Sequence, residues 1–472
     1  MNLQNIEKAH LIGIGGITVS AIAQLLASKG ITVSGSDMAI SSITDMAARA
    51  GVSIYEGHDP SNVPRDADVV IFSEAVPASN VERGAAAERG IQEMSAFSFW
   101  GAYAQDKKVI AVSGTNGKST TTAMLGRILT SAGYDPTVVV GTKVLGWDSN
   151  IRIGSSDWLV IEADEYHGHM HEFKPHIAVV TNVALDHLDY YRDGADISDQ
   201  FERWLKTVDK DGCIVLNRDD HMLKEMRIQH GCIKYFGLKG TEGIRSSGEI
   251  SLYEKRGMQG ENGFNIVDDE HDWGYVSLKF PGAHNRENAL AAAAAADCAG
   301  VKHQKITKAL TSFEGTWRRF EYVGLYHDAF IISDYAHHPD AIRSTIEAAR
   351  SWYGDSMHIV AVFEPHQHNR TKMLFKDFAK AFDGADELIL SEIYDVAGRE
   401  ESHDQDVTSE KLAHAIRERC VEKETTLQPD RVFYVKNLNN AEQAVKHRAK
   451  KGVTFLIMGA GNIDRIARNV VQ

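Results

Sequence analysis

The sequence predicts an α/β protein of three consecutive domains. Its 472 residues correspond to about three domains of roughly 150 residues each. Short apolar segments alternate with longer helix-like segments, a pattern that favours parallel sheets with helices on both faces. Glycine-bearing loops follow two of the predicted strands, at residues 13–16 and 114–117.

The first expected domain covers residues 1–106. Its apolar segments at 9–14, 31–35 and 67–73 are predicted strands, and residues 17–28 are a predicted helix. Each strand is followed by a loop and a helix, which is typical of a parallel sheet.

The second domain is expected over residues 107–312, and the third over 313–472. In the second, residues 240–280 suggest a small β insertion, and 285–299 form an alanine-rich predicted helix. Further strands are predicted in the second domain at 108–112, 158–161 and 177–180, and in the third at 329–332, 358–363, 387–390, 432–434 and 453–457.

Composition excludes several classes of protein. Hydrophobic residues make up 43% and charged residues 25% of the chain, which excludes a largely disordered protein. The net charge of −14 would repel nucleic acid and anionic membranes, so neither is an expected partner. The longest apolar run, at 289–296, is too short to span a bilayer. Without a signal-peptide pattern at the start, we expect a cytoplasmic protein.

The four cysteines are widely spaced and form no Cys-x-x-Cys motif. We therefore expect neither a disulfide framework nor a structural zinc site.

The first glycine loop is similar to a dinucleotide fingerprint. Gly13 and Gly15 precede a predicted helix, and Asp37 ends the next strand, 22 residues after Gly15. Thr18 stands where the third glycine of the motif belongs. A nucleotide diphosphate is favoured, and a tight turn without a ligand is the alternative.

The second glycine loop predicts a phosphate site. Successive backbone N–H groups at a helix start form a nest for anions. Lys118 can reach the β- and γ-phosphates, and the Ser119 hydroxyl can bind Mg²⁺. The loop is a short variant of the phosphate-binding motif, because Val112 stands where the strict pattern has glycine.

Carboxylates follow the next strands. Glu162 comes first after the apolar run 158–161 and is the better candidate metal ligand of the sequence Glu162-Ala163-Asp164-Glu165. His187 offers a nitrogen donor for a second divalent ion.

Together these motifs resemble the Mur ligase family, the ATP-dependent amide-forming enzymes of cell-wall precursor synthesis. The resemblance covers nearly the whole chain, and its most discriminating element is Asp334-Tyr335-Ala336-His337-His338-Pro339. It implies a Rossmann-like N-terminal domain that binds the UDP-sugar and a P-loop ATPase-type central domain that binds ATP. The C-terminal domain would be Rossmann-like and bind the amino acid. It also implies ATP, UDP-N-acetylmuramate and L-alanine as substrates, with Mg²⁺ as cofactor.

The resemblance carries site residues onto this sequence in four groups. The UDP-sugar group comprises Gly13, Gly15, Gly16, Ser20, Ser36 and Asp37. The ATP group comprises Gly114, Thr115, Asn116, Gly117, Lys118, Ser119, Thr120, His284, Asn285, Asn288, Arg319 and Asp334. The amino-acid and muramoyl group comprises Tyr335, His337, His338, His366 and Arg370, and the metal group comprises Ser119, Glu162 and His187.

In the implied reaction, a substrate carboxylate attacks the γ-phosphate of ATP, and an amine then displaces phosphate from the acyl phosphate. Lys118 and Arg319 would neutralise charge on the transferred group, and Glu162 and His187 would help to hold the ions. His337 is either a base for the amine or a hydrogen-bonding group that orients the substrate. Because Arg319 and Glu162 belong to different predicted domains, we expect closure about a hinge at 312–315.

Two residues depart from the family pattern in the expected amino-acid segment. Glu364 stands where Gln is common, and Gln367 stands where Arg is common in one branch of the family. Three other functions stay open. One is a recycling ligase that joins a preformed tripeptide to the same acceptor. Another is a nicotinamide-dependent oxidoreductase, which would leave residues 114–120 unexplained. The last is a non-catalytic nucleotide-binding regulator. The sequence does not indicate an oligomeric state.

Overall fold

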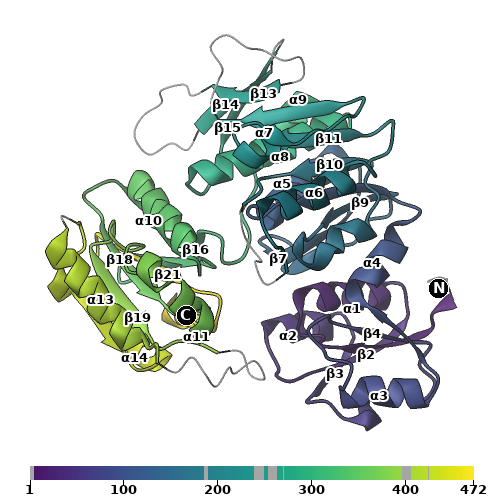
Figure 1. Ribbon diagram of the computed structural model, residues 1–472, viewed down its shortest axis with the longest axis horizontal. Coiled ribbons are helices and arrows are strands. Elements are labelled where there is room, and N and C mark those ends of the chain that lie inside the picture. The colour runs from purple at the N-terminus through teal and green to yellow at the C-terminus, as the bar shows by residue number, and fades with distance from the viewer. Residues whose placement is uncertain are drawn as a thin grey trace. The chain divides into compact units, whose positions relative to one another are not determined.

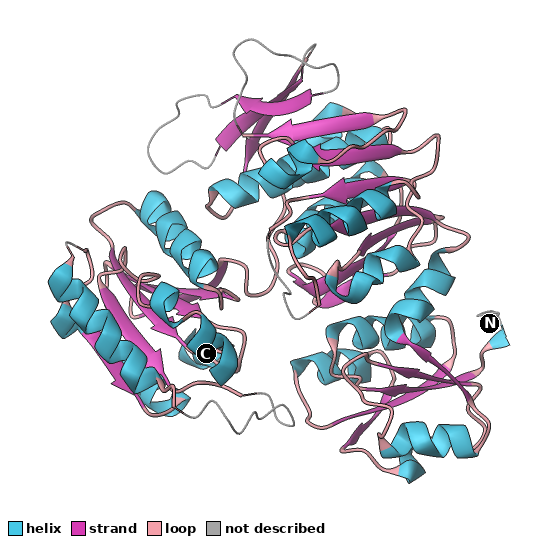
Figure 2. Cartoon of the chain, viewed as in Figure 1, coloured by secondary structure: helices cyan, strands magenta, loops and turns pink. Residues whose placement is uncertain are grey.

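The computed structural model describes residues 5–184, 190–238, 249–253, 263–268, 271–395, 406–423 and 425–471. It contains three sheets in chain order, each with its own helices (Figures 1 and 2). The predicted fold class, three consecutive α/β domains, is therefore confirmed. The chain forms two compact units that divide between Glu314 and Gly315, with the segment Ser277–Asn285 assigned to the second. Among the described residues, no helix is both long and apolar enough to cross a membrane.

The first sheet has five parallel strands in the order β3-β2-β1-β4-β5. The strand order reverses between β1 and β4, and in such sheets ligands bind beyond the carboxyl ends of the strands at that point. The loop after β1 carries Gly13 and Gly15 to this edge. The strands are β1 (Lys8–Ile12), β2 (Thr32–Asp37), β3 (Ser53–Glu56), β4 (Val69–Phe72) and β5 (Gln92–Ser95), and the helices are α1 (Ile17–Ser28), α2 (Ser42–Arg49), α3 (Val81–Glu88) and α4 (Ala96–Ala104).

The second sheet has the order β15-β14-β13-β12-β11-β10-β6-β9-β7-β8, with a parallel centre and antiparallel pairs toward both ends. The expected β insertion is confirmed by the last three strands of the domain. The strands are β6 (Lys108–Ser113), β7 (Thr137–Val144), β8 (Ser149–Arg152), β9 (Trp158–Glu162), β10 (Ile177–Val180), β11 (Cys213–Asn217), β12 (Ile233–Gly237), β13 (Glu249–Tyr253), β14 (Gly263–Asp268) and β15 (Asp272–Ser277).

Helices cover the second sheet, and the longest is the alanine-rich helix expected from the sequence. Small side chains let this helix pack closely: its residues from Ala289 to Ala296 are all fully buried. The helices of this domain are α5 (Lys118–Ala132), η3 (Tyr166–Glu172), α6 (Gly194–Leu205), α7 (His221–Glu225), α8 (Ala283–Cys298) and α9 (His303–Thr311).

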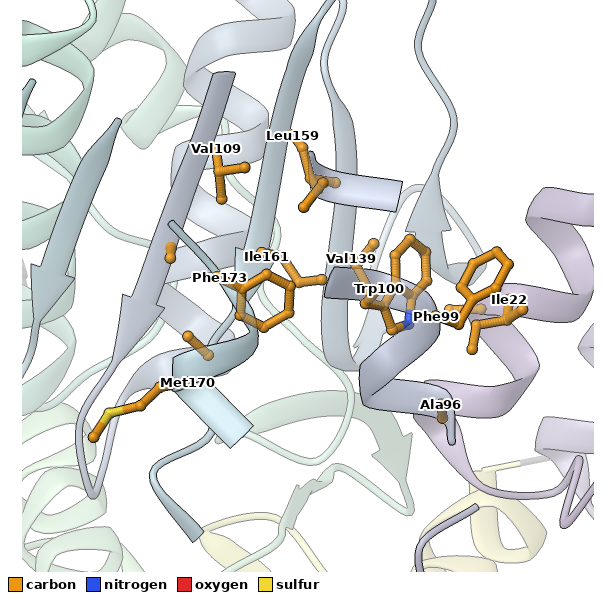
Figure 3. Packing of buried hydrophobic residues seen from close by; sticks show 14 of the residues in the cluster. Ile22, Ala96, Phe99, Trp100, Val109, Val139, Leu159, Ile161, Met170 and Phe173 are labelled. Atoms are coloured by element: carbon orange, nitrogen blue, oxygen red, sulfur yellow. The ribbon is translucent and has the colours of Figure 1, made fainter. Parts of the chain in front are cut away.

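A shared hydrophobic core joins the first two sheets into one unit. Figure 3 shows Phe99 and Trp100 of α4 packed with Ile22 of α1 and Val139 of β7. Both aromatic side chains are 1% exposed. Burial of side chains of this size contributes about 1.5–3 kcal/mol each to stability. The packing of α4 therefore stabilises the association of the two sheets.

Polar contacts add to this stabilisation. The Gln24 amide donates to Asn150 Oδ1 at 3.0 Å, and the Asn150 amide donates to the carbonyl of Ile17 at 2.7 Å. Because Asn150 is fully buried, these bonds fix the register of α1 against β8.

The third sheet has the order β16-β17-β21-β18-β19-β20 and is parallel except for its first strand. All five strands predicted in this domain are present, and β16 was not predicted. The strands are β16 (Glu321–Tyr326), β17 (Ala329–Asp334), β18 (His358–Phe363), β19 (Glu387–Ser391), β20 (Val432–Val435) and β21 (Val453–Met458), and the helices are α10 (Pro339–Tyr353), α11 (His368–Met373), α12 (Phe375–Phe378), α13 (Ser409–Glu422), α14 (Leu438–Arg448) and α15 (Asp464–Val471).

Two of the four cysteines are paired, which the expectation of no disulfide framework did not anticipate. Cys213 and Cys232 form a disulfide with their Cα atoms 4.8 Å apart. Strands β11 and β12 pair in parallel with Ile214 opposite Ile233, which places the residues before them side by side. Strand register, which spacing along the chain does not reveal, therefore brings the two sulfur atoms together.

Candidate active site

The loop between β6 and α5 has the backbone of an anion nest. Gly117 precedes α5 with φ of 88°, and a Cβ atom there would lie 2.2 Å from Asn288 Oδ1. Only glycine fits this position, because it tolerates the left-handed conformation and lets α8 approach the loop. The Thr121 hydroxyl donates to the same oxygen of Asn288 at 3.3 Å. The structure thus brings the predicted ATP residue Asn288 against the phosphate loop.

The residues that follow β10 hold the other side of the phosphate loop. The Thr181 hydroxyl donates to the carbonyl of Asn116 at 2.6 Å, and the Asn116 N–H donates to Asn182 Oδ1 at 3.0 Å. These bonds order Thr115 and Asn116 before any ligand binds, which reduces the entropy cost of holding phosphate.

The ammonium group of Lys118 is surrounded by oxygen atoms of the loop and of the acidic residues that follow β9. Its ammonium donates to the carbonyl of Gly114 and to Glu165 Oε2, both at 2.7 Å, and lies 3.6 Å from Asp164. Burial alone would lower the pKa of Lys118, but the carboxylates of Glu165 and Asp164 outweigh it and raise the pKa. The ammonium is therefore charged at neutral pH. Sequence reasoning missed Glu165 as its partner, although Glu165 belongs to the same acidic run as Glu162.

Ser119 and Glu162 meet at the edge of the sheet. The Ser119 hydroxyl donates to Glu162 Oε2 at 3.0 Å, and the other carboxylate oxygen accepts the N–H of Gly141. A hydroxyl and a carboxylate at this distance supply the oxygen donors that Mg²⁺ prefers. The third predicted metal ligand, His187, lies outside the described residues.

In the first sheet, Asp37 closes the turn after β1. Its Oδ2 accepts the N–H of Gly15 at 2.8 Å, and a Cβ atom on Gly15 would also lie 2.8 Å from that oxygen. The absence of a side chain at Gly15 allows the carboxylate to approach. Gly16 donates to the carbonyl of Gly13 at 3.0 Å, and the Ser20 hydroxyl donates to the carbonyl of Ile43 at 3.4 Å.

The hydroxyl of Ser36 is engaged inside the domain. It is fully buried and donates to Glu82, a residue that sequence reasoning missed. Glu82 also accepts from the Asn62 amide at 2.8 Å and lies within 3.5 Å of both His10 and His58. Burial opposes ionisation of Glu82, but these hydrogen bonds outweigh it and lower its pKa to about 2. The buried carboxylate thus organises the strand ends of the predicted UDP-sugar site.

In the second unit, the backbone turns Arg319 outward. Its neighbours Arg318 and Phe320 have φ of 56° and 46°, in the left-handed region, and both side chains are buried. Arg319 is exposed and lies over the ring of Tyr335, 5.2 Å from its centroid. Left-handed conformations at residues other than glycine are costly and cluster at functional sites. Arg319 is therefore the arginine of the pair that can meet a ligand.

Asp334 supports this turn. Its two carboxylate oxygens accept the N–H groups of Phe320 at 2.6 Å and Ala336 at 2.8 Å. Burial lowers the pKa of His284, the charge of Asp334 opposes this effect, and the charge of Arg319 adds to it. Three predicted ATP residues therefore lie together in the second unit. Asn285 is buried, and its amide donates to the carbonyl of Pro281.

His337 and His338 have different environments. His337 Nδ1 lies 3.0 Å from the carbonyl of Tyr335, so this nitrogen carries the proton of the neutral ring and leaves Nε2 as an acceptor. Burial lowers the pKa of His337 to about 4, and the charges of Arg370 and Arg319 act in the same direction. His338 instead caps α10, where its ring accepts the N–H of Asp340 at 3.3 Å. The predicted substrate contact of His338 stays a prediction.

His366 and Arg370 lie near His337. The rings of His366 and His337 have centroids 6.3 Å apart, and His366 stacks on Tyr394 at 5.6 Å. Sequence reasoning missed Tyr394, which pairs with His366 through an isolated backbone bridge. Glu364 precedes His366 by two residues. It is 4% exposed and accepts the N–H of Ile463 at 3.1 Å.

Comparisons with known proteins agree along the whole chain. The Mur ligase catalytic domain matches residues 8–108, the Mur ligase middle domain 112–296, and the Mur ligase glutamate ligase domain 318–461. The UDP-N-acetylmuramate--L-alanine ligase of Sulfurihydrogenibium sp. is 36% identical over 469 residues, covering 99% of this chain and 98% of the relative.

Solved structures show the same likeness. A UDP-N-acetylmuramate-alanine ligase from Thermotoga maritima has a TM-score of 0.82 at 27% identity, and 98% of each chain is covered. A murein peptide ligase from Psychrobacter arcticus shares the fold, with a TM-score of 0.71 at 24% identity over 98% of each chain. The chain belongs to the Mur ligase family.

Proposed function

We propose that the chain joins L-alanine to the lactyl carboxylate of UDP-N-acetylmuramate with hydrolysis of ATP to ADP and phosphate. The observation that carries this proposal is the phosphate loop, in which Lys118 and Ser119 meet Glu165 and Glu162 at neighbouring strand ends. The relatives' names supply the substrates, because full-length relatives at 36% identity are UDP-N-acetylmuramate--L-alanine ligases.

The first step is phosphoryl transfer. The lactyl carboxylate oxygen attacks the γ-phosphorus, the bond to ADP breaks, and an acyl phosphate forms. This chemistry needs positioning and charge neutralisation more than a protein nucleophile. Lys118 would leave Glu165 for the phosphate oxygens, and exposed Arg319 would add a second positive charge. Each such donor is worth roughly 3 kcal/mol in the transition state.

Ser119 and Glu162 would hold Mg²⁺, which neutralises phosphate charge when bound. Both supply oxygen donors, and Ser119 Oγ lies 3.0 Å from Glu162 Oε2. We include His187 in this proposal as a ligand of a second ion.

The second step is attack by the amine of L-alanine on the acyl carbonyl, with phosphate as leaving group. His337 is the group we assign to the amine. With a pKa of about 4, its neutral ring accepts a hydrogen bond at Nε2 and so orients the nucleophile. Lys118 and Glu162 belong to the first unit, and Arg319 and His337 to the second.

Phosphate release from ATP tests the proposal. The purified chain is given Mg²⁺ and UDP-N-acetylmuramate together with either L-alanine or the tripeptide L-Ala-γ-D-Glu-diaminopimelate. Release with L-alanine, and a product heavier by one alanyl residue in mass spectrometry, is the expected result. Release with the tripeptide alone would instead establish the recycling ligase. Tight ATP binding without turnover would indicate a regulator.

A further inference from the structure

Three cysteines from distant parts of the chain converge at one corner of the second sheet. Cys213 begins β11, Cys232 immediately precedes β12, and Cys298 ends α8. Their three sulfur atoms lie within 4.8 Å of one another. Strand register places the first two together, and the helix that covers the sheet adds the third.

This corner lies at the opposite edge of the sheet from the phosphate loop. Strands β6, β10 and β11 run parallel, so their amino-terminal ends share one edge and their carboxyl ends the other. The loop 114–117 follows the carboxyl end of β6, whereas Cys213 stands at the amino-terminal end of β11. The cysteine corner is therefore separate from the proposed ATP site.

We propose that Cys213, Cys232 and Cys298, when reduced, form a three-thiolate site for a divalent d¹⁰ cation such as Zn²⁺ or Cd²⁺. Such cations favour thiolate ligands. A Zn–S bond of about 2.3 Å in a tetrahedral site requires sulfur atoms about 3.8 Å apart. Sulfur atoms that already lie within 4.8 Å need only small side-chain shifts to meet this spacing. The site would keep a fourth position for water, because Cys232 and Cys298 are only partly buried.

The disulfide and the cation compete for the same atoms. A trialkylphosphine and one water reduce the Cys213–Cys232 bond to two thiols and yield the phosphine oxide. Binding of the cation then displaces the thiol protons.

Charged residues lie next to the three cysteines. Lys234 is paired with Asp297, whose other oxygen lies 3.1 Å from His303 Nε2. The ammonium near Cys298 would balance part of the negative charge that three thiolates bring to one cation.

Cadmium titration of the full-length protein tests the proposal. The protein is reduced with a trialkylphosphine, freed of reductant and titrated anaerobically with Cd²⁺, while ultraviolet sulfur-to-metal charge-transfer absorption is recorded. We expect saturation at one Cd²⁺ per chain. Cys298→Ser should abolish the band while the Cys213–Cys232 disulfide still forms on reoxidation, as peptide mass spectrometry would show.

Cys420→Ser is the matched control, because Cys420 is also a free thiol but lies in the second unit. This variant should titrate as the unchanged protein does, and the unreduced protein should show no band. Equal cadmium binding by Cys298→Ser and the unchanged protein, or no binding by the reduced protein, would overturn the proposal. Circular dichroism checks that each variant is folded, and the assay does not depend on the ligase activity.

Discussion

Glu364 has a buried carboxyl group, and its ionisation is unfavourable in the folded protein. Replacing it with the neutral amide in Glu364→Gln should therefore raise the free energy of unfolding above neutral pH. The side chain is 4% exposed, and burial raises its pKa from 4.5 to about 7, against the opposing effects of the Ile463 N–H and the Arg318 charge. Gln keeps a carbonyl oxygen that can accept the Ile463 N–H. It removes only the group that must ionise.

The sign and size of the effect follow from this pKa. Because the folded-state pKa exceeds the unfolded value, the protonated carboxyl contributes stability that is complete below about pH 4.5 and is lost as pH rises through 7. The difference between 4.5 and about 7 corresponds to ~3 kcal/mol at most. We therefore expect Glu364→Gln to exceed the unchanged protein in stability by less than ~1 kcal/mol at pH 5 and by ~1–3 kcal/mol at pH 8.5.

Urea-induced unfolding of the full chain, followed by circular dichroism from pH 5 to 8.5, measures this difference. Glu347→Gln is the control, since Glu347 is an exposed residue of α10 in the same unit. Its stability curve should run parallel to that of the unchanged protein. If the free energy of unfolding of Glu364→Gln differed from that of the unchanged protein by the same amount at every pH in this range, the argument from burial would be refuted.

Three further predictions concern the first unit. Lys118→Met should lower the rate of phosphate release by about 10²–10³-fold without loss of helix content, and a normal rate would exclude Lys118 from the transition state. Gly117→Ala should raise the KM for ATP, because its Cβ would lie 2.2 Å from Asn288 Oδ1, and adding Asn288→Ala should recover part of the loss in initial-rate assays. Glu82→Gln should lower stability by up to ~3 kcal/mol at pH 7, since the pKa near 2 means that the ionised group stabilises the fold above about pH 4.5 and loses this effect as pH falls through 2. Urea midpoints that differ equally at pH 7 and pH 2 would contradict this account.

The phosphate loop illustrates what local sequence can predict. A buried strand, glycines at the turn and a lysine at the helix start indicate the nest, and the structure has each of these in place. The acidic run after β9 likewise lies beside the loop, because the carboxyl ends of parallel strands share one edge. The alanine-rich helix was also predictable, since its composition and length suit no other element.

Other parts of the site could not be read from local pattern. Glu82, which lies 46 residues after Ser36 in the chain, accepts the hydrogen bond of the Ser36 hydroxyl. Nothing in the local pattern indicated that the ring of His338 would cap α10. Tyr394 lies beside His366 only because two loops meet beyond neighbouring strands.

The sequence by itself determined the three-domain α/β organisation, the position of the phosphate loop and the arginine and histidine motifs of the third domain. These features depend on periodicity and turn chemistry within short segments. Only the tertiary structure decided that Lys118 meets Glu165, that Glu82 organises the first sheet, and that three cysteines share one corner. The physical reason is that such contacts depend on strand order, register and helix packing, and these join side chains that are far apart along the chain.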